Sequence, residues 1–334
     1  MNFETIEGIL NINLNSTMTL ALAAVLLIMG YSINKRLSIL NKYCIPAPVV
    51  GGFIFMFLTW IGHVTGTFKF NFENIFQSTF MLAFFTTVGL GASFALLKKG
   101  GKLLIIYWLV CGIISIFQNI IGITITKITG LEAPYALLSS AISMIGGHGA
   151  ALAYGGTFAK MGYENAPLVG AAAATFGLIT AVLIGGPLGR RLIEKNNLRP
   201  DNSENFDQSI MEINKNEGEK LSDLDVIKNV VVILVCMAIG SYISTLIGKL
   251  IKMDFPSYVG AMFMAVIVRN INEKTHSYNF NFSLVDGIGN VMLNLYLALA
   301  LMTLKLWELS GLIGGVLLVV ACQVIFMKIG RASC

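Results

Sequence analysis

The sequence predicts an all-α polytopic membrane protein made of two inverted repeats of about five spans each, with a re-entrant hairpin, the second repeat being incomplete. Three observations lead to this fold class. Only 12% of the 334 residues are charged, whereas soluble domains carry about 25%. The mean hydropathy is +0.75, and the apolar residues gather in long uncharged runs. The two halves also resemble each other at an offset of about 210 residues.

Ten segments are apolar enough to be candidate elements of a hydrocarbon core about 30 Å thick. They are 16–33, 48–66, 78–97, 101–126, 133–160, 166–190, 226–250, 255–271, 284–303 and 309–328. The residues before them include acidic but no basic side chains, so they are not a secretory signal peptide. The five cysteines form no CxxC pair, which favours core residues over disulfides or a zinc site.

Segment 133–160 differs from the others because Gly146–Gly149, with the sequence GGHG, interrupts its middle. Irregular backbone at membrane depth is tolerated only where it is buried in protein or lines a wet cavity. We therefore expect a re-entrant hairpin of two half-helices that enters and leaves from one side. The alternative is one straight span with a glycine-rich packing face.

The long polar stretch 191–225 predicts a flexible linker between a first repeat, 1–190, and a second repeat, 226–334. Cytoplasmic loops of multi-pass proteins carry an excess of lysine and arginine. With the N-terminus and the hairpin entry outside, most of the 23 lysine and arginine residues fall on the inner side, many of them in the linker. The outer side then keeps Lys69, Lys127, Lys160, Lys249, Lys252 and Lys305.

The internal repeat rests on three pairs of matching segments in the same order. They are Ile45–Gly52 with Phe255–Gly260, Met81–Phe85 with Met292–Tyr296, and Leu97–Gly101 with Trp307–Gly311. In the predicted topology the first copy begins inside at Pro46 and the second outside at Pro256. Inverted repeats of this kind are typical of secondary transporters, whose substrate lies near the midplane between broken helices.

The same offset places the counterpart of Gly146–Gly149 near position 356, whereas the sequence stops at Cys334. We therefore expect the second half to lack its hairpin and last span. A C-terminal truncation or a frame disruption would explain this, and a naturally asymmetric protein is the alternative.

Several motifs together resemble those of one family of membrane carriers. They are Ile45–Gly52, Phe80–Leu90, Gln118–Gly122, Gly146–Ala150, Ala174–Leu178, Ile184–Pro187 and Leu304–Leu309. The chain resembles the bacterial sodium/glutamate symporter family along nearly its whole length. The resemblance implies ten spans in two inverted repeats, a homodimer in the lipid of the bacterial inner membrane, and glutamate uptake driven by sodium. Family members carry a second glycine-rich re-entrant motif, which this sequence lacks.

The glycine-rich break is the candidate site for L-glutamate. Helix N-termini offer backbone N–H groups and partial positive charge to carboxylates, and glycine lets the backbone approach a ligand closely. The substrate-binding residues predicted there are Ser143, Gly146, Gly147, His148 and Gly149. The alternative is a packing turn in which His148 is hydrogen-bonded internally.

Two amides, Gln118 and Asn119, lie inside an otherwise apolar span. Amides in hydrocarbon need partners, so they either support an unwound stretch near the substrate or join neighbouring helices. We include both among the substrate-binding candidates.

Sodium is favoured over protons as the coupling ion because Asp286 and Glu308 lie near span ends and only His148 could carry a proton. Hydroxyl and carbonyl oxygens suit sodium, and the ion-binding candidates are Thr86, Thr87, Gly89, Thr175 and Gly177. Mid-helix threonines also bond back to their own helix, which is the alternative role. No cofactor, and no metal besides the transported sodium, is expected.

Other functions are weaker interpretations of the same residues. The sequence has no HExxH motif, no in-membrane aspartate pair and no Ser–His arrangement, so it does not indicate an enzyme. No basic run with interleaved aromatic residues suggests nucleic acid binding. The open alternatives are a channel, a sodium-coupled carrier of another carboxylate such as citrate, and an inactive truncated fragment.

Overall fold

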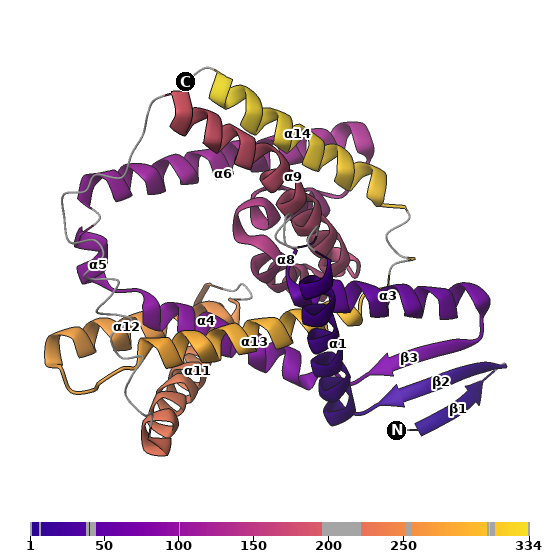
Figure 1. Cartoon of the computed structure of the whole chain (residues 1–334), viewed down its shortest axis with the longest axis horizontal. Helices are drawn as coiled ribbons and strands as arrows, with labels where there is room; N and C mark the ends of the chain where they lie inside the picture. Colours follow the sequence, from indigo (N-terminus) through magenta and orange to yellow (C-terminus); the bar gives the residue numbers. More distant parts are fainter. Residues whose placement is uncertain are drawn as a thin grey trace. The chain divides into compact units, whose positions relative to one another are not determined.

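The computed structural model describes residues 2–6, 8–37, 40, 45–99, 101–195, 222–251, 255–305, 307 and 311–332. Most of these residues are helical (Figure 1). The helices are α1 (Ser16–Arg36), α3 (Ala47–Thr65), α4 (Ile75–Gly91), α5 (Phe94–Lys99), α6 (Gly101–Thr129), α7 (Ala133–Leu137), the π-helix η1 (Leu138–Ile142), α8 (Ser143–Lys160), α9 (Ala166–Lys195), α11 (Asp223–Ile251), α12 (Ser257–Thr275), α13 (Phe282–Met302) and α14 (Ile313–Ala332). The strands are β1 (Asn2–Ile6), β2 (Ile9–Leu14) and β3 (Phe68–Phe72).

Six of the described helices are long and apolar enough to cross a membrane. They are α1, α3, α6, the segment Ala133–Lys160, α11 and α13. Shorter apolar helical stretches occupy Ile75–Gly91, Ala166–Gly177 and Ile313–Met327. The prediction of a helical multi-pass membrane protein is therefore confirmed. Most of the predicted linker, 196–221, lies outside the described residues.

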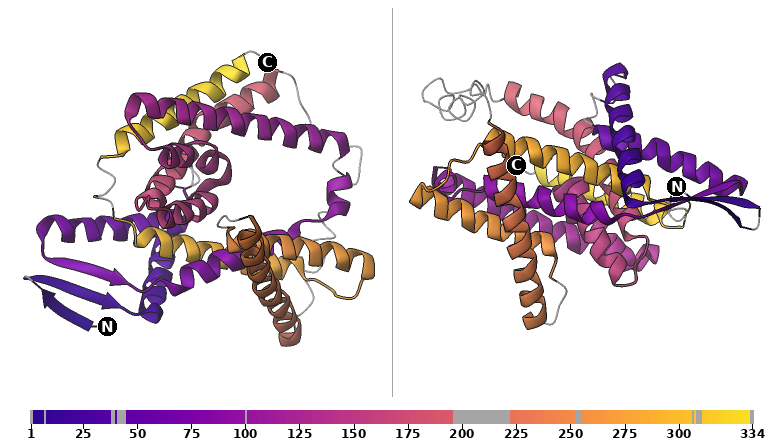
Figure 2. Two further views of the ribbon diagram at one scale, coloured as in Figure 1. Left: turned by 180° about the vertical axis from the view of Figure 1, so that it is seen from behind. Right: turned by 90° about the horizontal axis from the view of Figure 1, so that it is seen from below.

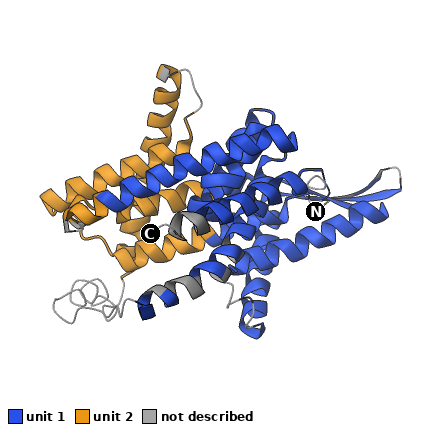
Figure 3. Cartoon of the chain, turned by 90° about the horizontal axis from the view of Figure 1, so that it is seen from above, with its two compact units in different colours: residues 1–77, 106–196, 294–334 blue, residues 78–105, 197–293 orange. Residues whose placement is uncertain are grey.

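The chain folds into two compact units, each drawing on both halves of the sequence (Figure 3). Unit 1 comprises residues 1–77, 106–196 and 294–334, and unit 2 comprises residues 78–105 and 197–293. Unit 1 therefore holds α1, α3, the broken segment, α9 and α14, and unit 2 holds most of α4 together with α11 and α12.

A three-stranded sheet, which the sequence did not predict, covers part of α3 in unit 1 (Figure 2). β2 is the central strand, antiparallel to β1 and parallel to β3. The ring of Phe55 on α3 lies 5.1 Å from that of Phe70 and 6.0 Å from that of Phe72. These edge-to-face contacts of aromatic rings attach β3 to the helix.

The helices α1 and α3 approach each other through glycine. A Cβ atom added at Gly30 would lie 2.1 Å from the main-chain oxygen of Ala47. One added at Gly51 would lie 2.1 Å from the main-chain oxygen of Leu26. Both distances are shorter than any van der Waals contact, so only glycine permits this crossing, as is common between helices in membranes.

The helices α11 and α12 of unit 2 approach each other in the same way. A Cβ atom at Gly240 would lie 2.3 Å from the Cα atom of Ala261. One at Gly260 would lie 2.1 Å from the hydroxyl oxygen of Ser244. Each pair thus has one glycine on each helix, facing the main chain or a small side chain of the other.

Both helix pairs also tie the loop between them to the first helix. The side-chain nitrogen of Asn34 donates to the carbonyl oxygen of Ile45 at 2.9 Å, just before α3. The hydroxyl of Ser244 donates to the carbonyl oxygen of Pro256 at 3.2 Å, just before α12. The second helix of each pair follows a proline cap, Pro46 or Pro256, whose fixed φ suits a helix start.

In unit 2, Asn270 on α12 closes the gap between α4 and α5. Its side-chain oxygen accepts from the backbone N–H of Phe94 at 2.7 Å, and its nitrogen donates to the carbonyl oxygens of Ala92 at 3.1 Å and Val266 at 2.7 Å. The amide therefore satisfies backbone groups that the helix break leaves without a helical partner.

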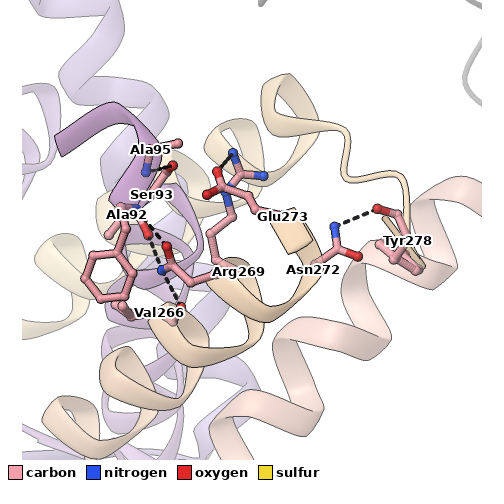
Figure 4. A network of polar contacts seen from close by, with 10 residues as sticks. Ala92, Ser93, Ala95, Val266, Arg269, Asn272, Glu273 and Tyr278 are labelled. Atoms are coloured by element: carbon pink, nitrogen blue, oxygen red, sulfur yellow. Dashed lines mark hydrogen bonds and ion pairs between the residues drawn. The ribbon is translucent and has the colours of Figure 1, made fainter. Parts of the chain in front are cut away.

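The same end of α12 carries an ion pair (Figure 4). Arg269 Nη2 lies 2.9 Å from Glu273 Oε1, and the guanidinium carbon lies 4.0 Å from the ring centroid of Phe282. One turn along the helix, the side-chain nitrogen of Asn272 donates to the carbonyl oxygen of Tyr278 at 2.7 Å. These contacts join α12 to the segment that leads into α13.

Candidate functional site

The segment from Ala133 to Lys160 is a helix interrupted twice. Ser140 in η1 has φ −111° and ψ −133°, and Gly147 in α8 has φ 61° and ψ −162°. The conformation of Gly147 is one that essentially only glycine adopts. The interruption predicted within Gly146–Gly149 is therefore present at Gly147. The interruption at Ser140 was not predicted.

The broken segment is fastened to α9 by small residues and a buried hydroxyl. A Cβ atom at Gly170 would lie 2.8 Å from the carbonyl oxygen of Ala151, so α8 and α9 are in close contact there. The buried hydroxyl of Ser143 is shared between two main-chain oxygens, those of Leu138 and, at 3.2 Å, of Gly170. Ser143, a predicted substrate-binding residue, thus holds the broken segment in place.

Next to the Gly147 break, His148 is joined to α9 by a hydrogen bond. Its Nε2 lies 2.9 Å from the hydroxyl oxygen of Thr175, and that hydroxyl donates to the carbonyl oxygen of Ala171 at 2.8 Å. Because the hydroxyl has one proton, it accepts from Nε2, which must then carry the ring proton. This leaves Nδ1 of the neutral ring as an acceptor. Two predicted site residues, His148 and Thr175, are therefore brought together.

At the Ser140 break, the side chain of Gln323 forms hydrogen bonds to two other segments of the chain. The side-chain nitrogen of Gln323 on α14 donates to the carbonyl oxygen of Gln118 at 2.7 Å and to the hydroxyl oxygen of Ser140 at 3.0 Å. The Ser140 hydroxyl itself donates to the carbonyl oxygen of Ala136 at 2.7 Å. Gln118 and Gln323 are both buried, and the side-chain oxygen of each has no hydrogen-bond partner.

Both glutamines line a cavity of about 320 Å³ between α6, α8, α9 and α14. Its wall also contains Met144, Gly177 and Thr180. The cavity therefore brings together two of the predicted site residues, Gln118 and Gly177. A cavity of this size has room for a small ion and its remaining water molecules.

Comparison with known proteins agrees with the geometry of a membrane carrier. The family model of the sodium/glutamate symporter matches residues 12–331. The sodium/glutamate symporter of Haemophilus influenzae is 38% identical over 312 residues, which cover 92% of this chain and 77% of the relative. That of Escherichia coli is 33% identical over 319 residues, covering 95% and 79%. The chain belongs to the sodium/glutamate symporter family. No solved structure gives a significant match.

Membership of this family confirms the resemblance and the predicted function, sodium-coupled transport of glutamate. The sodium ion is accordingly the coupling ion and a transported species. The chain belongs to a family of carriers rather than enzymes.

The other predicted ion-binding residues of the symporter, Thr86, Thr87 and Gly89, belong to unit 2. The hydroxyl of Thr86 donates to the carbonyl oxygen of Leu82 and that of Thr87 to the carbonyl oxygen of Phe84, each at 2.7 Å. A Cβ atom at Gly89 would lie 2.3 Å from a main-chain oxygen of α12. These three residues thus pack or bond within helices, as the alternative role of mid-helix threonines anticipates.

Three remaining predicted residues flank the two breaks. Gly146 is exposed, and Gly149 is half-buried on the other side of Gly147. Asn119 is half-buried beside Gln118, and its side-chain oxygen is buried without a partner. All three are in unit 1 with the broken segment.

Sequence reasoning missed Gln323 and Ser140. Gln323 is the only amide in the apolar run from Ile313 to Met327, and that isolation is the signal that could have singled it out. Ser140 gives no comparable signal, because serine is compatible with a continuous helix and its neighbour Ser139 lies in the same segment.

A larger cavity, of about 390 Å³, lies elsewhere in unit 1 between the sheet, α3 and the residues after α13. It is lined by His63, whose ring stacks on that of Trp307 with centroids 4.1 Å apart, and by Lys69 and Lys305. None of the predicted site residues lies on its wall.

Proposed function

We propose that this symporter binds L-glutamate at the Gly147 break and carries it into the cell together with sodium by alternating access. The observation that carries the proposal is the break itself, a glycine-only conformation directly followed by a buried histidine with a fixed hydrogen bond. Such a break supplies free backbone groups inside an apolar protein, where a charged substrate needs them.

The chemistry of the break suits a dicarboxylate amino acid. The part of α8 after Gly147 runs on to Lys160, so its first N–H groups and partial positive charge are available to a carboxylate. Gly146 is exposed, which leaves the backbone beside the break accessible to a ligand. Nδ1 of His148 is then placed to accept a hydrogen bond from the substrate ammonium group.

We also propose the two inverted repeats that the sequence predicts. The supporting observation is the match between the two helix pairs. Gly30 in α1 and Gly240 in α11 are separated by the same offset of about 210 residues as Asn34 and Ser244. Each of these residues makes the contact of its counterpart, a glycine crossing or a bond to the loop before the next helix.

Contacts between the repeats support the same proposal. In unit 1, a Cβ atom at Gly52 of α3 would lie 2.6 Å from the Cβ atom of Leu301 in α13. In unit 2, one at Gly89 of α4 would lie 2.3 Å from the main-chain oxygen of Met262 in α12. At the repeat offset Met262 corresponds to Gly52, and α13 corresponds to α4. The contact of α3 with α13 is thus the counterpart of the contact of α12 with α4, and each joins a helix of one repeat to a helix of the other.

The proposed orientation places the N-terminus outside, the segment 133–160 as a hairpin entering from outside, and the linker 191–225 inside, since this arrangement keeps most basic residues in the cytoplasm. A bacterial inner-membrane location and a homodimer follow from the family resemblance. Protease added to intact cells should leave the linker uncut, and cleavage there would contradict the orientation.

The first test of the function is uptake of labelled glutamate into proteoliposomes containing this chain, with and without an inward sodium gradient. We expect uptake only with the gradient. An excess of unlabelled glutamate should abolish the signal and an excess of citrate should not. Inhibition by citrate at equal concentration would favour the alternative, a carrier of other carboxylates.

The site is tested by substituting two of the three histidines in parallel. His148→Ala should raise the apparent KM for glutamate at saturating sodium by about tenfold, the effect of losing a charge-assisted contact. His276→Ala is the matched control, because His276 is an exposed residue at the end of α12. Equal kinetics for the two variants would contradict a substrate site at the Gly147 break.

A further inference from the structure

We infer that Gln118, Ser140 and Gln323 form a binding site for the sodium ion beside the cavity between α6, α8, α9 and α14. This inference rests on the proposed function, since it locates the ion that the carrier couples to glutamate. It differs from the sequence prediction, which sought the ion at threonines and glycines.

The first argument is the orientation of the Gln323 amide. Its nitrogen lies 2.7 Å from the carbonyl oxygen of Gln118, an atom that can only accept a hydrogen bond. Exchanging the two ends of the amide would put two oxygens at this distance, so the orientation is fixed by the contact. Both amide protons are then used, on Gln118 and on Ser140, and the oxygen of Gln323 faces away from these donor contacts.

The second argument is that the side-chain oxygens of both glutamines are buried without a donor. Gln323 is 1% exposed and Gln118 is 3% exposed, and the side-chain oxygen of each has no hydrogen-bond partner. Leaving a buried polar group unpaired costs about 1–3 kcal/mol. Both glutamines line the same cavity, from α6 and from α14, and a cation bound there would remove this cost.

The third argument concerns the kind of cation. In the part of the chain that the structure describes, no group of three His, Cys, Asp or Glu side chains could hold a metal ion. Amide and hydroxyl oxygens without a formal charge are hard donors, which suit alkali and alkaline-earth cations rather than zinc or copper. A divalent ion normally requires carboxylates to balance its charge, so this neutral set favours the monovalent ion that the family transports.

The hydroxyl of Ser140 is the third oxygen ligand of the proposed site, beside the side-chain oxygens of Gln118 and Gln323. Its hydroxyl donates to the carbonyl oxygen of Ala136 and accepts from Gln323, which leaves one lone pair for an ion. A Cβ atom at Gly122 of α6 would lie 2.1 Å from this hydroxyl oxygen, so α6 reaches it closely only because position 122 is glycine. The ion would thus be bound where the broken segment meets α6 and α14.

The pairing of α6 with α14 adds a symmetry argument. In the proposed repeats these helices are the fourth spans of the two halves, and each contributes one buried glutamine. Sites of secondary transporters lie where equivalent broken or crossing elements of two repeats meet. A sodium site between α6 and α14 would respond to any movement of one repeat against the other.

The test measures sodium binding separately from transport. Purified protein in detergent is melted in sodium chloride and in potassium chloride at equal ionic strength. We expect sodium to raise the melting temperature of the wild-type chain, and Gln323→Leu and Gln118→Leu to abolish this difference. In proteoliposomes the half-saturating sodium concentration for glutamate uptake should rise at least tenfold in Ser140→Ala.

Ser139→Ala is the matched control for Ser140→Ala. Both hydroxyls are fully buried and donate to the carbonyl oxygen four residues earlier, but only Ser140 contacts Gln323. Ser139→Ala should therefore keep the wild-type sodium dependence. Gln323→Asn, which keeps the amide but withdraws its oxygen, should give an intermediate value if Gln323→Leu does not fold.

The outcomes separate the site from the function. Sodium-dependent uptake in the wild type, with unchanged sodium dependence in folded Gln323→Leu, Gln323→Asn and Ser140→Ala, would overturn the site and leave the function intact. Equal stabilisation of the wild type by sodium and potassium would mean that there is no sodium-specific site, and would also overturn the proposal. Sodium-specific stabilisation lost in the variants, without any glutamate uptake by the wild type, would support the site and refute the function.

Discussion

Two side-chain amides, Asn270 in unit 2 and Gln323 in unit 1, show how differently the same chemical group is used. The amide of Asn270 makes two hydrogen bonds to backbone groups at the gap between α4 and α5 and a third to a carbonyl oxygen of its own helix. The amide of Gln323 uses its nitrogen fully but leaves its buried oxygen without a donor beside a cavity. A saturated amide joins helices, whereas an unsaturated one beside a cavity retains the capacity to bind a ligand.

Two glycines that were both predicted as ion-binding residues, Gly89 and Gly177, show a similar contrast. An added Cβ atom at Gly89 would meet the main-chain oxygen of Met262, which cannot move independently of α12. One at Gly177 would lie 2.8 Å from the sulfur of Met144, which is part of a flexible side chain beside the cavity. The glycine in unit 2 therefore serves packing, and the one in unit 1 borders an open space.

The largest expected effect is the loss of stability when Gly89 is replaced by alanine, compared with the same replacement at Gly177. Gly89→Ala should lower the free energy of unfolding by about 3 kcal/mol, because overpacking against a main-chain atom forces helices apart. Gly177→Ala should cost less than about 1 kcal/mol, because a methionine side chain can move aside. Melting temperatures of both variants in one detergent check the prediction. A larger loss for Gly177→Ala would contradict the packing account.

The next effect concerns the amides themselves. Asn270→Leu should lower the free energy of unfolding by about 2 kcal/mol, because the N–H of Phe94 and the carbonyl of Ala92 lose their side-chain partner. Gln323→Leu should change it by less than about 1 kcal/mol, because an unpaired buried oxygen is removed along with two donor contacts. Thermal melting without sodium is the measurement. Equal destabilisation would show that Gln323 is also a structural amide.

Some structural features of the symporter can be predicted from its sequence because they depend on local patterns. The spans follow from apolar runs, and the Gly147 break follows from a cluster of glycines that no continuous helix favours. Both are local properties of short stretches of chain. The family resemblance rested on ordered local motifs and is likewise confirmed.

Other features depend on contacts between distant segments. Gln118 and Gln323 are 205 residues apart, and nothing in either run announces that their helices meet. The break at Ser140 lies where these helices meet, since its hydroxyl contacts Gln323 of α14 and lies beside Gly122 of α6. In the sheet, β2 pairs with β3, although α1 and α3 lie between these strands in the sequence. Local alternation of apolar and polar residues alone cannot predict such a pairing.

A smaller effect compares two threonines that were both predicted to bind the ion. Thr175→Val should lower the free energy of unfolding by about 1 kcal/mol, because His148 loses its hydrogen-bond acceptor. The same variant should raise the KM for glutamate, since the ring is no longer held. Thr87→Val should change stability by no more than about 0.5 kcal/mol, because its hydroxyl bonds only within its own helix. An unchanged KM for Thr175→Val would show that the orientation of His148 is unimportant for binding.

The smallest effect tests whether the end of α12 is stabilised mainly by the ion pair of Arg269 and Glu273 or by the amide of Asn270. Glu273→Gln removes the ion pair with Arg269, which spans one helical turn with side chains 15% and 24% exposed. Pairs of this spacing contribute about 0.5 kcal/mol, and Arg269 keeps its contact with Phe282 in the variant. Lys228→Gln is the matched control, because the pair of Lys228 with Asp225 is 4.0 Å long and half exposed. Melting at low and high salt should show a small, salt-sensitive loss for Glu273→Gln and none for Lys228→Gln. A loss as large as that of Asn270→Leu would mean that charge, rather than the amide, holds the end of α12 in place.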